Sequence, residues 1–476
     1  MWALWLTLAP GAQASDVGFL LRPEAAIDLK ADRKGEDDAE LRTRMRAFAN
    51  GDLDDGSKWF FEIWGEHQLL SGDDLEGWWD VKPGPTGWRG SAGAWTIQAG
   101  HLVERWGKLD LLPVMDVVNP RDLSAGPLTP LEFQRLPLPM LTFEIGAGDL
   151  QATTVVVPWA GADRVDSRGT DWSLLRQRMV GQYTAGMADW ECCFDDLGES
   201  IGTLGASLED QDARFRRTLN VANAERALPG ALFYNGEIAQ RLTLDRPGFD
   251  ATLTGGWMRT NQAAGTLEPA ISDIVQTELL PPVTELQNVL GGATSMVENE
   301  WPRTWLAGLE ASTLVGAFGV RGEARWLSDH VARSKYLRSS TTPAVSGGIG
   351  VDWSYGTTVF LSAEARYEKM LEPPTTLLFA KRDHVTVGGT ARVSLLMDKL
   401  RLNVLGIYDV SFQDWMARPT VTWRPSDEWE VTGGALLLDG ASDAPRGLSE
   451  MLTYQGGAGS YWSQNDAATL AVTWIR

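Results

Sequence analysis

Short segments in which apolar and polar residues alternate recur along almost the whole chain, and this period of two most constrains its fold. In Thr357–Glu368, for example, Leu361 lies on an apolar face and Glu364 on the opposite, charged face. Such alternation is typical of β-strands, since successive side chains point to opposite sides. About eighteen strands are predicted, with sixteen as the alternative if two weak ones fail. The predicted segments are Val17–Leu29, Leu41–Ala49, Lys58–Leu69, Leu75–Val81, Ala94–Glu104, Met140–Ile145, Gln151–Trp159, Tyr234–Leu244, Asp250–Thr260, Arg303–Ser312, Gly316–Leu327, Ala344–Ser354, Thr357–Glu368, His384–Met397, Leu400–Val410, Met416–Arg424, Trp429–Leu438 and Ala467–Ile475.

The connections between these segments are alternately short and long. Arg246–Gly248 and Tyr355–Gly356 are short, whereas Asn261–Trp301, His330–Pro343 and Asp439–Asp466 are long. Short turns on one side and long loops on the other are typical of outer-membrane barrels. Phe412–Asp414 is an exception, because it is short where a long loop is expected.

Aromatic residues favour a barrel in lipid over a soluble one. Many apolar faces end in an aromatic residue, and the chain contains 22 Trp. This resembles the aromatic girdles at bilayer interfaces. The predicted fold is therefore an all-β, transmembrane, antiparallel up-and-down β-barrel. The aromatic residues at the ends of the apolar faces are Trp95, Trp257, Trp305, Trp326, Trp353, Tyr367, Trp423, Trp429 and Trp474.

The segment Arg105–Pro139 interrupts the pattern and is predicted to fold back into the barrel lumen. Its many Leu and Val residues would make a fully solvated loop costly, and structureless loops of this length are usually functional or disordered. Its charged residues are expected to meet the charged wall and to form a constriction that sets pore size and charge preference. The predicted constriction residues are Asp110, Asp116, Arg121, Asp122, Glu132 and Arg135.

Charged residues on the polar strand faces are predicted to line the lumen. An alternative interpretation is that they form a salt-bridge lattice which stiffens the wall. The predicted wall residues are Arg42, Arg44, Arg46, Glu62, Glu66, Glu310, Arg321, Glu323, Arg325, Glu364, Arg366, Arg392 and Arg401.

The N-terminal segment predicts where the protein is located, and the net charge and the cysteines exclude several classes of protein. Residues 1–14 read as a secretory signal ending in Ala-x-Ala, so that residues 15–476 form one barrel domain with a long extracellular loop at residues 160–230. This loop is expected to contain a surface helix, Leu208–Arg226. A net charge of -21 argues against nucleic acid as a partner. Neighbouring Cys192 and Cys193 provide no disulfide framework and no four-ligand metal site.

Several short motifs resemble a family of uncharacterised proteobacterial outer-membrane proteins, the domain of unknown function 1302 group. They are Gly100–Val103, Trp106-Gly107, Asn119–Asp122 and Leu136–Met140, and Lys108 stands where the family usually has an acid. The resemblance implies a β-barrel that works with envelope transport systems for hydrophobic or lipid-like compounds.

The function that the sequence favours is a porin-like channel for small solutes or hydrophobic, lipid-like compounds in the bacterial outer membrane. A closed structural or adhesive barrel is the alternative. An outer-membrane hydrolase is a weaker one, because His384 is the best candidate base and no nucleophile accompanies it. No cofactor or metal is expected. The expected partners are outer-membrane lipid and lipopolysaccharide, the barrel-assembly machinery, and a periplasmic carrier or efflux system.

Overall fold

A computed structural model describes residues 16–30, 39–71, 76–130, 132–164, 172, 236–267, 297–445, 450–451 and 453–476. Four sequence predictions lie outside these residues: the signal at residues 1–14, the helix Leu208–Arg226, the pair Cys192 and Cys193, and most of the loop at residues 160–230. No helix in the described part of the chain is long and apolar enough to cross a membrane.

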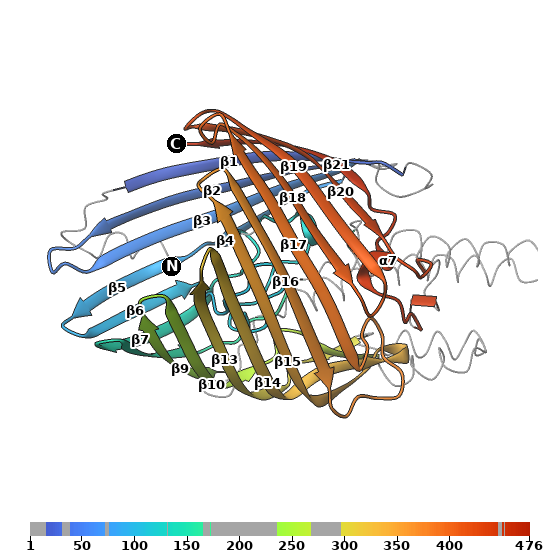
Figure 1. Cartoon of the computed structure of the whole chain (residues 1–476), viewed down its shortest axis with the longest axis horizontal. Helices are drawn as coiled ribbons and strands as arrows, with labels where there is room; N and C mark the ends of the chain where they lie inside the picture. The colour runs from blue at the N-terminus through green and yellow to red at the C-terminus, as the bar shows by residue number, and fades with distance from the viewer. Residues whose placement is uncertain are drawn as a thin grey trace, which may run out of the picture.

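Antiparallel strands form one closed barrel (Figure 1). The sheet contains 19 strands, and β1 pairs with β21, which closes the ring. Because β4 and β5 both pair with β3, they occupy one position, and the wall has 18 positions. The strands are β1 (Asp16–Asp28), β2 (Ala39–Asp52), β3 (Lys58–Ser71), β4 (Glu76–Pro83), β5 (Thr86–Ala92), β6 (Trp95–Leu102), β7 (Leu138–Ala147), β8 (Leu150–Val157), β9 (Glu237–Arg246), β10 (Phe249–Arg259), β13 (Arg303–Val315), β14 (Phe318–Ser334), β15 (Arg338–Tyr355), β16 (Val359–Met370), β17 (Asp383–Leu395), β18 (Leu400–Asp409), β19 (Asp414–Ser426), β20 (Trp429–Asp439) and β21 (Ala467–Ile475).

The predicted up-and-down order and the count of about eighteen strands are confirmed. Each strand of the wall pairs with its sequence neighbours, except that β4 and β5 both pair with β3 and not with each other. Tight turns join the strands at one end of the barrel. Longer connections lie at the other end. A separate two-stranded sheet of β11 (Ala264–Leu267) and β12 (Val297–Glu300) belongs to one of them, and a short helix, α7 (Ala458–Tyr461), to another.

The prediction of a long loop at His330–Pro343 is wrong. The hairpin of β14 and β15 continues through this stretch and closes over a single 3-10 turn, η3 (Lys335–Leu337). A register shift between Leu327 and His330 explains the error, since an irregularity there breaks the period of two on which the prediction depended. His330, predicted in a loop, therefore belongs to β14, where its Nε2 lies 3.8 Å from Glu368 Oε1.

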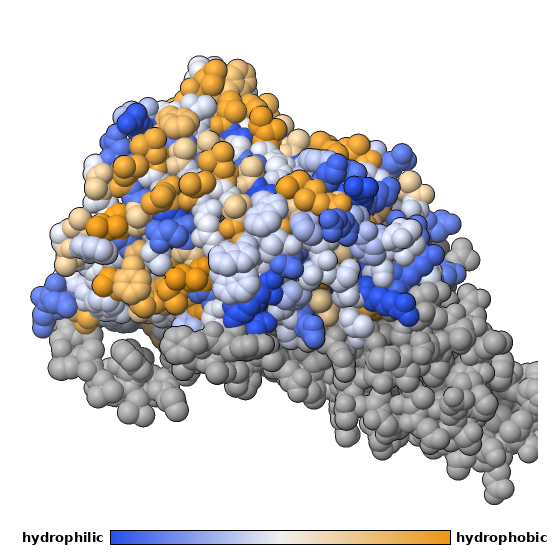
Figure 2. Space-filling model, turned by 90° about the horizontal axis from the view of Figure 1, so that it is seen from below, coloured by the Kyte–Doolittle hydropathy of each residue, from blue (hydrophilic) through white to orange (hydrophobic). Residues whose placement is uncertain are grey.

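The outer face of the wall is apolar and exposed, with apolar side chains in patches over the surface (Figure 2). Leu309 and Val404, for example, are 52% and 51% exposed. Aromatic rings gather towards both ends of the strands. Trp429 and Trp474 pair near the tight turns, with ring centres 6.4 Å apart, and Trp257 and Trp305 pair near the opposite end, at 4.7 Å. An apolar belt with aromatic edges is the surface that a bilayer requires of a barrel.

Candidate constriction inside the barrel

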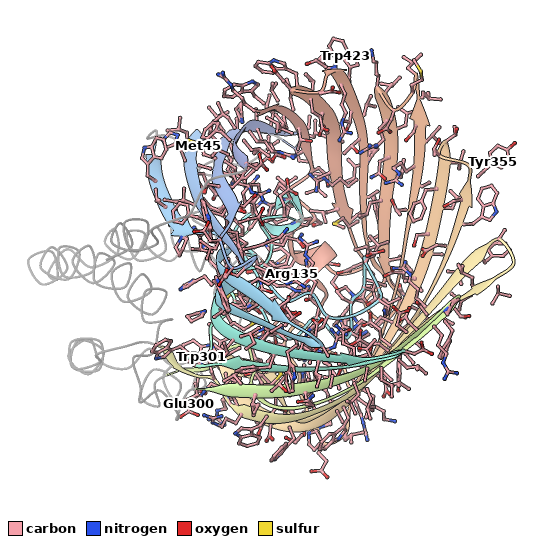
Figure 3. The ribbon with its side chains drawn as sticks, turned by 90° about the vertical axis from the view of Figure 1, so that its left-hand side faces the viewer. Met45, Arg135, Glu300, Trp301, Tyr355 and Trp423 are labelled. Atoms are coloured by element: carbon pink, nitrogen blue, oxygen red, sulfur yellow. The ribbon has the colours of Figure 1, made fainter. Side chains whose placement is uncertain are left out.

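The connection between β6 and β7, residues Val103–Pro137, enters the barrel; we call it the inner loop. Arg135 of this loop lies within the ring of strands, whereas Tyr355 and Trp423 project from the outside (Figure 3). The bounds agree with the predicted excursion Arg105–Pro139 to within two residues at each end. The inner loop contacts side chains on the buried face of the wall, opposite the exposed apolar face.

Three buried wall carboxylates bind the backbone of the first half of the loop. Glu323 accepts hydrogen bonds from the N–H groups of four residues, at 2.5 Å from Leu109, 2.7 Å from Val114 and 2.8 Å from Met115, with Lys108 as the fourth donor. Glu364 accepts three more, from residues 110–112 at 2.8–3.0 Å. Glu310 accepts one from Gly107 at 3.0 Å. Hydrogen bonds to an ionised carboxylate are stronger than neutral ones, so this half of the loop is firmly attached.

The pairing register of β13 and β14 brings two of these carboxylates together, and the inner loop offsets their mutual repulsion. Glu310 and Glu323 face each other directly across β13 and β14. Two like charges in that arrangement destabilise a sheet. The N–H groups of the loop and the guanidinium of Arg241, 3.0 Å from Glu310, supply the opposing positive charge. Gly107 has φ +100, a left-handed conformation that glycine adopts readily, and it turns these N–H groups towards both glutamates.

Small residues on the wall make room for the apolar side chains of the same loop segment. A Cβ added at Gly308 would lie 2.2 Å from Met115, and one added at Gly348 would lie 2.5 Å from Leu109. Leu102, Trp106, Met115 and Val118 belong to a buried core with residues of β7 to β10, β13 and β14. The inner loop therefore fills this side of the lumen.

We call Gly308 and Gly348 the glycine cradle, and the substitution Gly348→Leu is a direct test of its contact with the inner loop. The new side chain must displace Leu109 or Val114, and overpacking a tight site costs about 1–3 kcal/mol. We expect faster proteolysis of the inner loop with unchanged barrel assembly, measured by limited digestion of the protein in vesicles. Gly433→Leu is the control, because nothing lies within 4 Å of a Cβ at that position. Equal digestion of the two variants would show that Gly348 does not hold the loop.

The second half of the loop crosses to the other side of the barrel. Its 3-10 turn, η1 (Gly126–Leu128), packs with Leu436 and Leu438 of β20, and Arg418 of β19 donates a hydrogen bond to the carbonyl of Pro127 at 2.9 Å. Phe133 packs edge-on against Trp64 of β3, with ring centres 5.4 Å apart. The inner loop therefore contacts the wall on several sides.

Asp122 links this half of the loop to β4 and to the segment after β8. Its carboxylate is 2.7 Å from Lys82 Nζ and 3.3 Å from Arg164 Nη1, and Arg164 also reaches Asp80 at 2.5 Å. We call these four residues the latch. Burial by itself raises the pKa of Asp122, but Lys82 and Arg164 outweigh it and hold the pKa well below its usual value.

The lowered pKa gives the latch a defined pH dependence. A depressed carboxyl pKa stabilises the attachment fully above its ordinary value of 3.8, and this stabilisation is lost as the pH falls through the lowered value. We therefore expect channel current to be steady between about pH 7 and pH 5 and to become larger or noisier only below about pH 4. Asp122→Asn should show the acidic behaviour at neutral pH, whereas Asp398→Asn, in an exposed hairpin turn, should not. Identical traces from both variants at neutral pH would contradict this role.

The predicted constriction residues meet one another and the wall in four groups. Asp116 binds Arg121 at 3.0 Å and Arg135 at 2.9 Å, all within the inner loop. Asp110 binds Arg321 of β14 at 2.7 Å, and Asp122 belongs to the latch. Glu132 lies 3.9 Å from Arg22 of β1. The sequence prediction did not separate pairs inside the loop from pairs between loop and wall.

The predicted wall residues form charge clusters on the buried face. Arg42 and Arg44 share Glu66 at 3.0 Å each, and Arg46 binds Glu62 at 2.6 Å. Arg321 binds Glu364 at 3.1 Å, while Arg325 and Arg366 share Glu368. Arg401 binds Asp398 at the tight turns, and Arg392 of β17 lies over the ring of Phe360. The lattice interpretation therefore describes most of these residues, while Glu310, Glu323 and Glu364 serve the loop.

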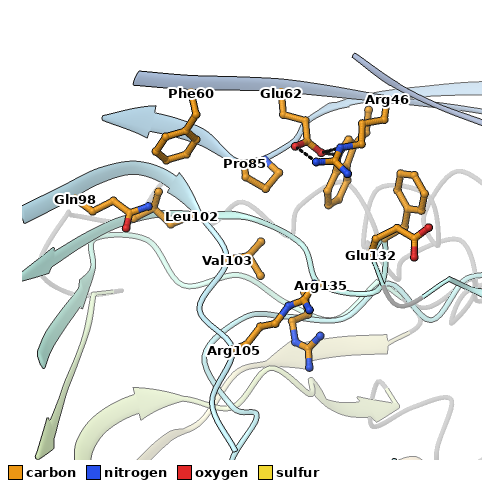
Figure 4. A pocket seen from close by; sticks show the side chains of 12 residues that line it. Arg46, Phe60, Glu62, Pro85, Gln98, Leu102, Val103, Arg105, Glu132 and Arg135 are labelled. Atoms are coloured by element: carbon orange, nitrogen blue, oxygen red, sulfur yellow. Dashed lines mark hydrogen bonds and ion pairs between the residues drawn. The ribbon is translucent and has the colours of Figure 1, made fainter. Parts of the chain in front are cut away.

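A pocket of about 450 Å³ lies between the inner loop and the wall on the side of β2, β3 and β6 (Figure 4). Its charged lining consists of Arg46, Arg105, Arg135, Glu62 and Glu132. Phe60, Trp64, Pro85, Leu102, Val103 and Phe133 form the apolar lining, and Gln98 is also present. The guanidinium of Arg105 is exposed and makes no ion pair or hydrogen bond with any residue that the structure describes.

Sequence reasoning missed Lys82, Arg164, Asp80 and the cradle glycines. Lys82 and Asp80 follow the period of two and point inward from β4, so the strand phase could have identified them. Arg164 lies in a connection without any period. Nothing in the sequence shows that glycines on β13 and β15 face a loop from residues 109–115.

The candidate base His384 makes a 2.6 Å contact with Asp409 Oδ2 through Nε2. The nearby Ser411 hydroxyl donates to the backbone carbonyl of Asp383, at 3.4 Å. The Thr386 hydroxyl lies 3.5 Å from the same Nε2 atom, and the His384–Asp409 pair lies at the long-connection end of the barrel.

No protein-family model and no curated protein matches the chain. Among solved structures, the chain is similar to OccK5 (OpdH) of Pseudomonas aeruginosa, with 8% identity, a TM-score of 0.47, and 96% of this chain and 97% of that chain covered. It is also similar to OccAB1 of Acinetobacter baumannii, with 7% identity, a TM-score of 0.47, and 98% and 99% covered. A third is OmpF of Salmonella typhi in complex with daunomycin, with 7% identity, a TM-score of 0.41, and 98% of both chains covered. At this identity none of them assigns a function to the chain.

Proposed function

We propose that the chain is a porin-like channel of the bacterial outer membrane, which passes small solutes through a lumen narrowed by the inner loop. The observation that carries the proposal is the asymmetric attachment of this loop. Glu323, Glu364 and the glycine cradle hold its first half against β13 to β17, and a charged pocket remains beside β2, β3 and β6. A barrel of this size is wide enough for an aqueous path unless it is plugged.

The outer surface supports the proposed location. An apolar belt with aromatic edges would be a liability in water, and it matches the hydrocarbon band of a bilayer. Outer-membrane lipid and lipopolysaccharide would then surround the belt, and the barrel-assembly machinery would insert it. A periplasmic carrier or efflux system remains the proposed partner in transport.

The pocket favours anions. Its lining contains three arginines and two glutamates, although the chain as a whole carries a net charge of -21. Arg46 is compensated by Glu62, whereas Arg105 forms no ion pair with any described residue. A lumen lined with uncompensated Arg or Lys selects anions.

Arg105→Glu is expected to shift this preference towards cations. At separations of several ångströms, one unit of charge in a wet pore contributes on the order of 1 kcal/mol. Because the substitution changes the charge by two units, we expect roughly a thirtyfold change in the permeability ratio. The measurement is the reversal potential of single channels in a planar bilayer under a KCl gradient.

Lys399→Glu, in an exposed hairpin turn, makes the same charge change outside the pocket and should leave the ratio unaltered. A purified, folded barrel that shows no conductance would favour the closed structural or adhesive alternative. Equal shifts in both variants would remove the pocket from the conducting path.

A further inference from the structure

Within the described part of the chain, one strand of the wall has an unpaired edge. β4 pairs with β3 from Leu70↔Glu76 to Ile63↔Pro83, and it pairs with no other described strand. Its continuation β5 pairs with β6, but β6 ends at Leu102, level with the break at Gly84 and Pro85 between β4 and β5. On the far side of β6, β7 also begins at this level, since Leu102 pairs with Leu138. Beyond the level of Leu102, towards the end with the long connections, no described strand continues the wall beside β4.

The gap begins within the depth of the membrane. β6 has 8 residues, fewer than the 9–11 that a transmembrane strand needs. Tilted as strands in barrels are, it rises only about 20 Å, short of an apolar band of about 25 Å. Beside the gap, Trp79 and Val81 of β4 are each 64% exposed on the outer face. Lipid does not tolerate an open backbone edge, except where the edge is covered by protein or lines a water-filled cavity.

The pocket lies directly behind this gap. Pro85, from the break between β4 and β5, and Leu102 and Val103, from the end of β6, all line it. The lining is amphipathic, with aromatic and aliphatic side chains beside the exposed guanidinium of Arg105 (Figure 4). Its volume of about 450 Å³ suits one small amphiphile.

The latch closes the gap on the inner side. Lys82 and Asp80 point inward from the unpaired strand and bind Asp122 of the inner loop and Arg164 of the segment after β8. Backbone hydrogen bonds join these two segments to each other, from Leu123 N to the carbonyl of Arg164 at 2.8 Å and from Arg164 N to that of Arg121 at 2.8 Å. Side-chain ion pairs thus replace the ladder that closes the rest of the wall.

We infer that the gap beside β4 is a lateral portal, through which single-chain amphiphiles with an anionic headgroup pass between the pocket and the outer leaflet. The inference rests on the proposed channel, because the pocket belongs to the same path. Arg105 binds the anionic headgroup, and Leu102, Val103 and Phe133 pack against the alkyl chain of the amphiphile. The structure shows the portal closed by the latch. Breaking the latch lets Asp122 and Arg164 move away from β4 without disrupting any strand pairing.

The test uses one variant in two states. In a Cys192→Ser, Cys193→Ser background, Lys82→Gln, Asp80→Cys and Arg164→Cys together remove the ion pairs of the latch. A short reversible bis-thiosulfonate linker then joins the two introduced thiols. The native side chains approach to 2.5 Å, so a short linker suffices. The probe is a dodecyl sulfonate with a diazirine at the chain end, preloaded into phosphatidylcholine vesicles that hold the protein. Mass spectrometry measures photolabel on Leu102, Val103 and Phe133.

We expect labelling of the pocket to fall about tenfold when the linker is in place, equivalent to about 1.4 kcal/mol, and to return when reductant removes it. The control pair is Asp149→Cys with Arg246→Cys, an exposed contact of 3.2 Å at the tight turns, where the linker should have no effect. Unchanged labelling with the portal fastened would overturn the inference.

Arg105 tests the class of ligand. Arg105→Gln should lower labelling by the sulfonate about tenfold, whereas Arg105→Lys should retain most of it. Labelling by a dodecyl alcohol with the same diazirine should be unchanged in both variants. Equal labelling by the sulfonate and by a dodecyl trimethylammonium probe would refute the anionic headgroup. KCl conductance of the fastened variant separates the two proposals. If conductance persists while labelling does not respond, only the portal fails; if no conductance is seen at all, the channel fails.

Discussion

Replacing Glu323 and Glu364 together by alanine is expected to release the inner loop and to increase single-channel conductance in planar bilayers. The two carboxylates accept seven backbone hydrogen bonds from residues 108–115, and both are at least 95% buried. A buried donor left without an acceptor costs about 1–3 kcal/mol, so even the four donors of Glu323 amount to on the order of 4 kcal/mol or more. The loop avoids this cost if it moves away from the wall, because water then accepts hydrogen bonds from its N–H groups. This movement widens the conducting path.

The barrel itself should assemble normally, because β14 and β16 keep their backbone pairing with their neighbours. Glu430→Ala is the matched control. Glu430 also lies on the polar face of a strand and binds Arg424 at 2.7 Å, but no hydrogen bond or ion pair joins it to the described residues of the inner loop. Unchanged conductance in the double variant, with a folded barrel, would show that the first half of the loop does not limit the path. A similar rise in Glu430→Ala would indicate a general loosening of the wall instead.

The order of strands was predictable because each one repeats the same local signal. A period of two survives wherever one face meets an apolar surface and the other a polar lumen, and it requires no knowledge of distant residues. The prediction failed where local irregularity interrupts the period. The bulge after Leu327 hid the upper part of β14, and the break at Gly84 and Pro85 hid β5.

The candidate site was predictable in its residue types but not in its contacts. The apolar content of Arg105–Pro139 indicated that the loop must pack against something, and the strand phase placed Glu323 and Glu364 on the polar face. That these carboxylates bind backbone N–H groups depends on contacts more than 200 residues apart in sequence. The same holds for the latch, where Asp80, Asp122 and Arg164 come from three separate segments of the chain.

Val404→Arg is expected to destabilise the barrel in a bilayer by about 2–4 kcal/mol, because it places a charge on the lipid face near the midplane. Val404 is 51% exposed on the outer face of β18, and four residues along a tilted strand raise it about 10 Å above the turn. Aromatic girdles do not reach this depth, so the guanidinium has no interface to which it can extend.

The neighbouring change Asn403→Arg tests the same strand on its other face. Asn403 is partly buried on the lumen side, where its side chain accepts a hydrogen bond from Thr390 at 3.1 Å, so an arginine there remains in contact with water. We expect a cost below about 1 kcal/mol, as for most substitutions on a solvated surface. Urea unfolding of the two variants in phospholipid vesicles measures the difference. Equal stability of Val404→Arg and Asn403→Arg would mean that the exposed apolar face does not contact lipid, and the channel proposal would fail with it, since a barrel outside a membrane has nothing to conduct across.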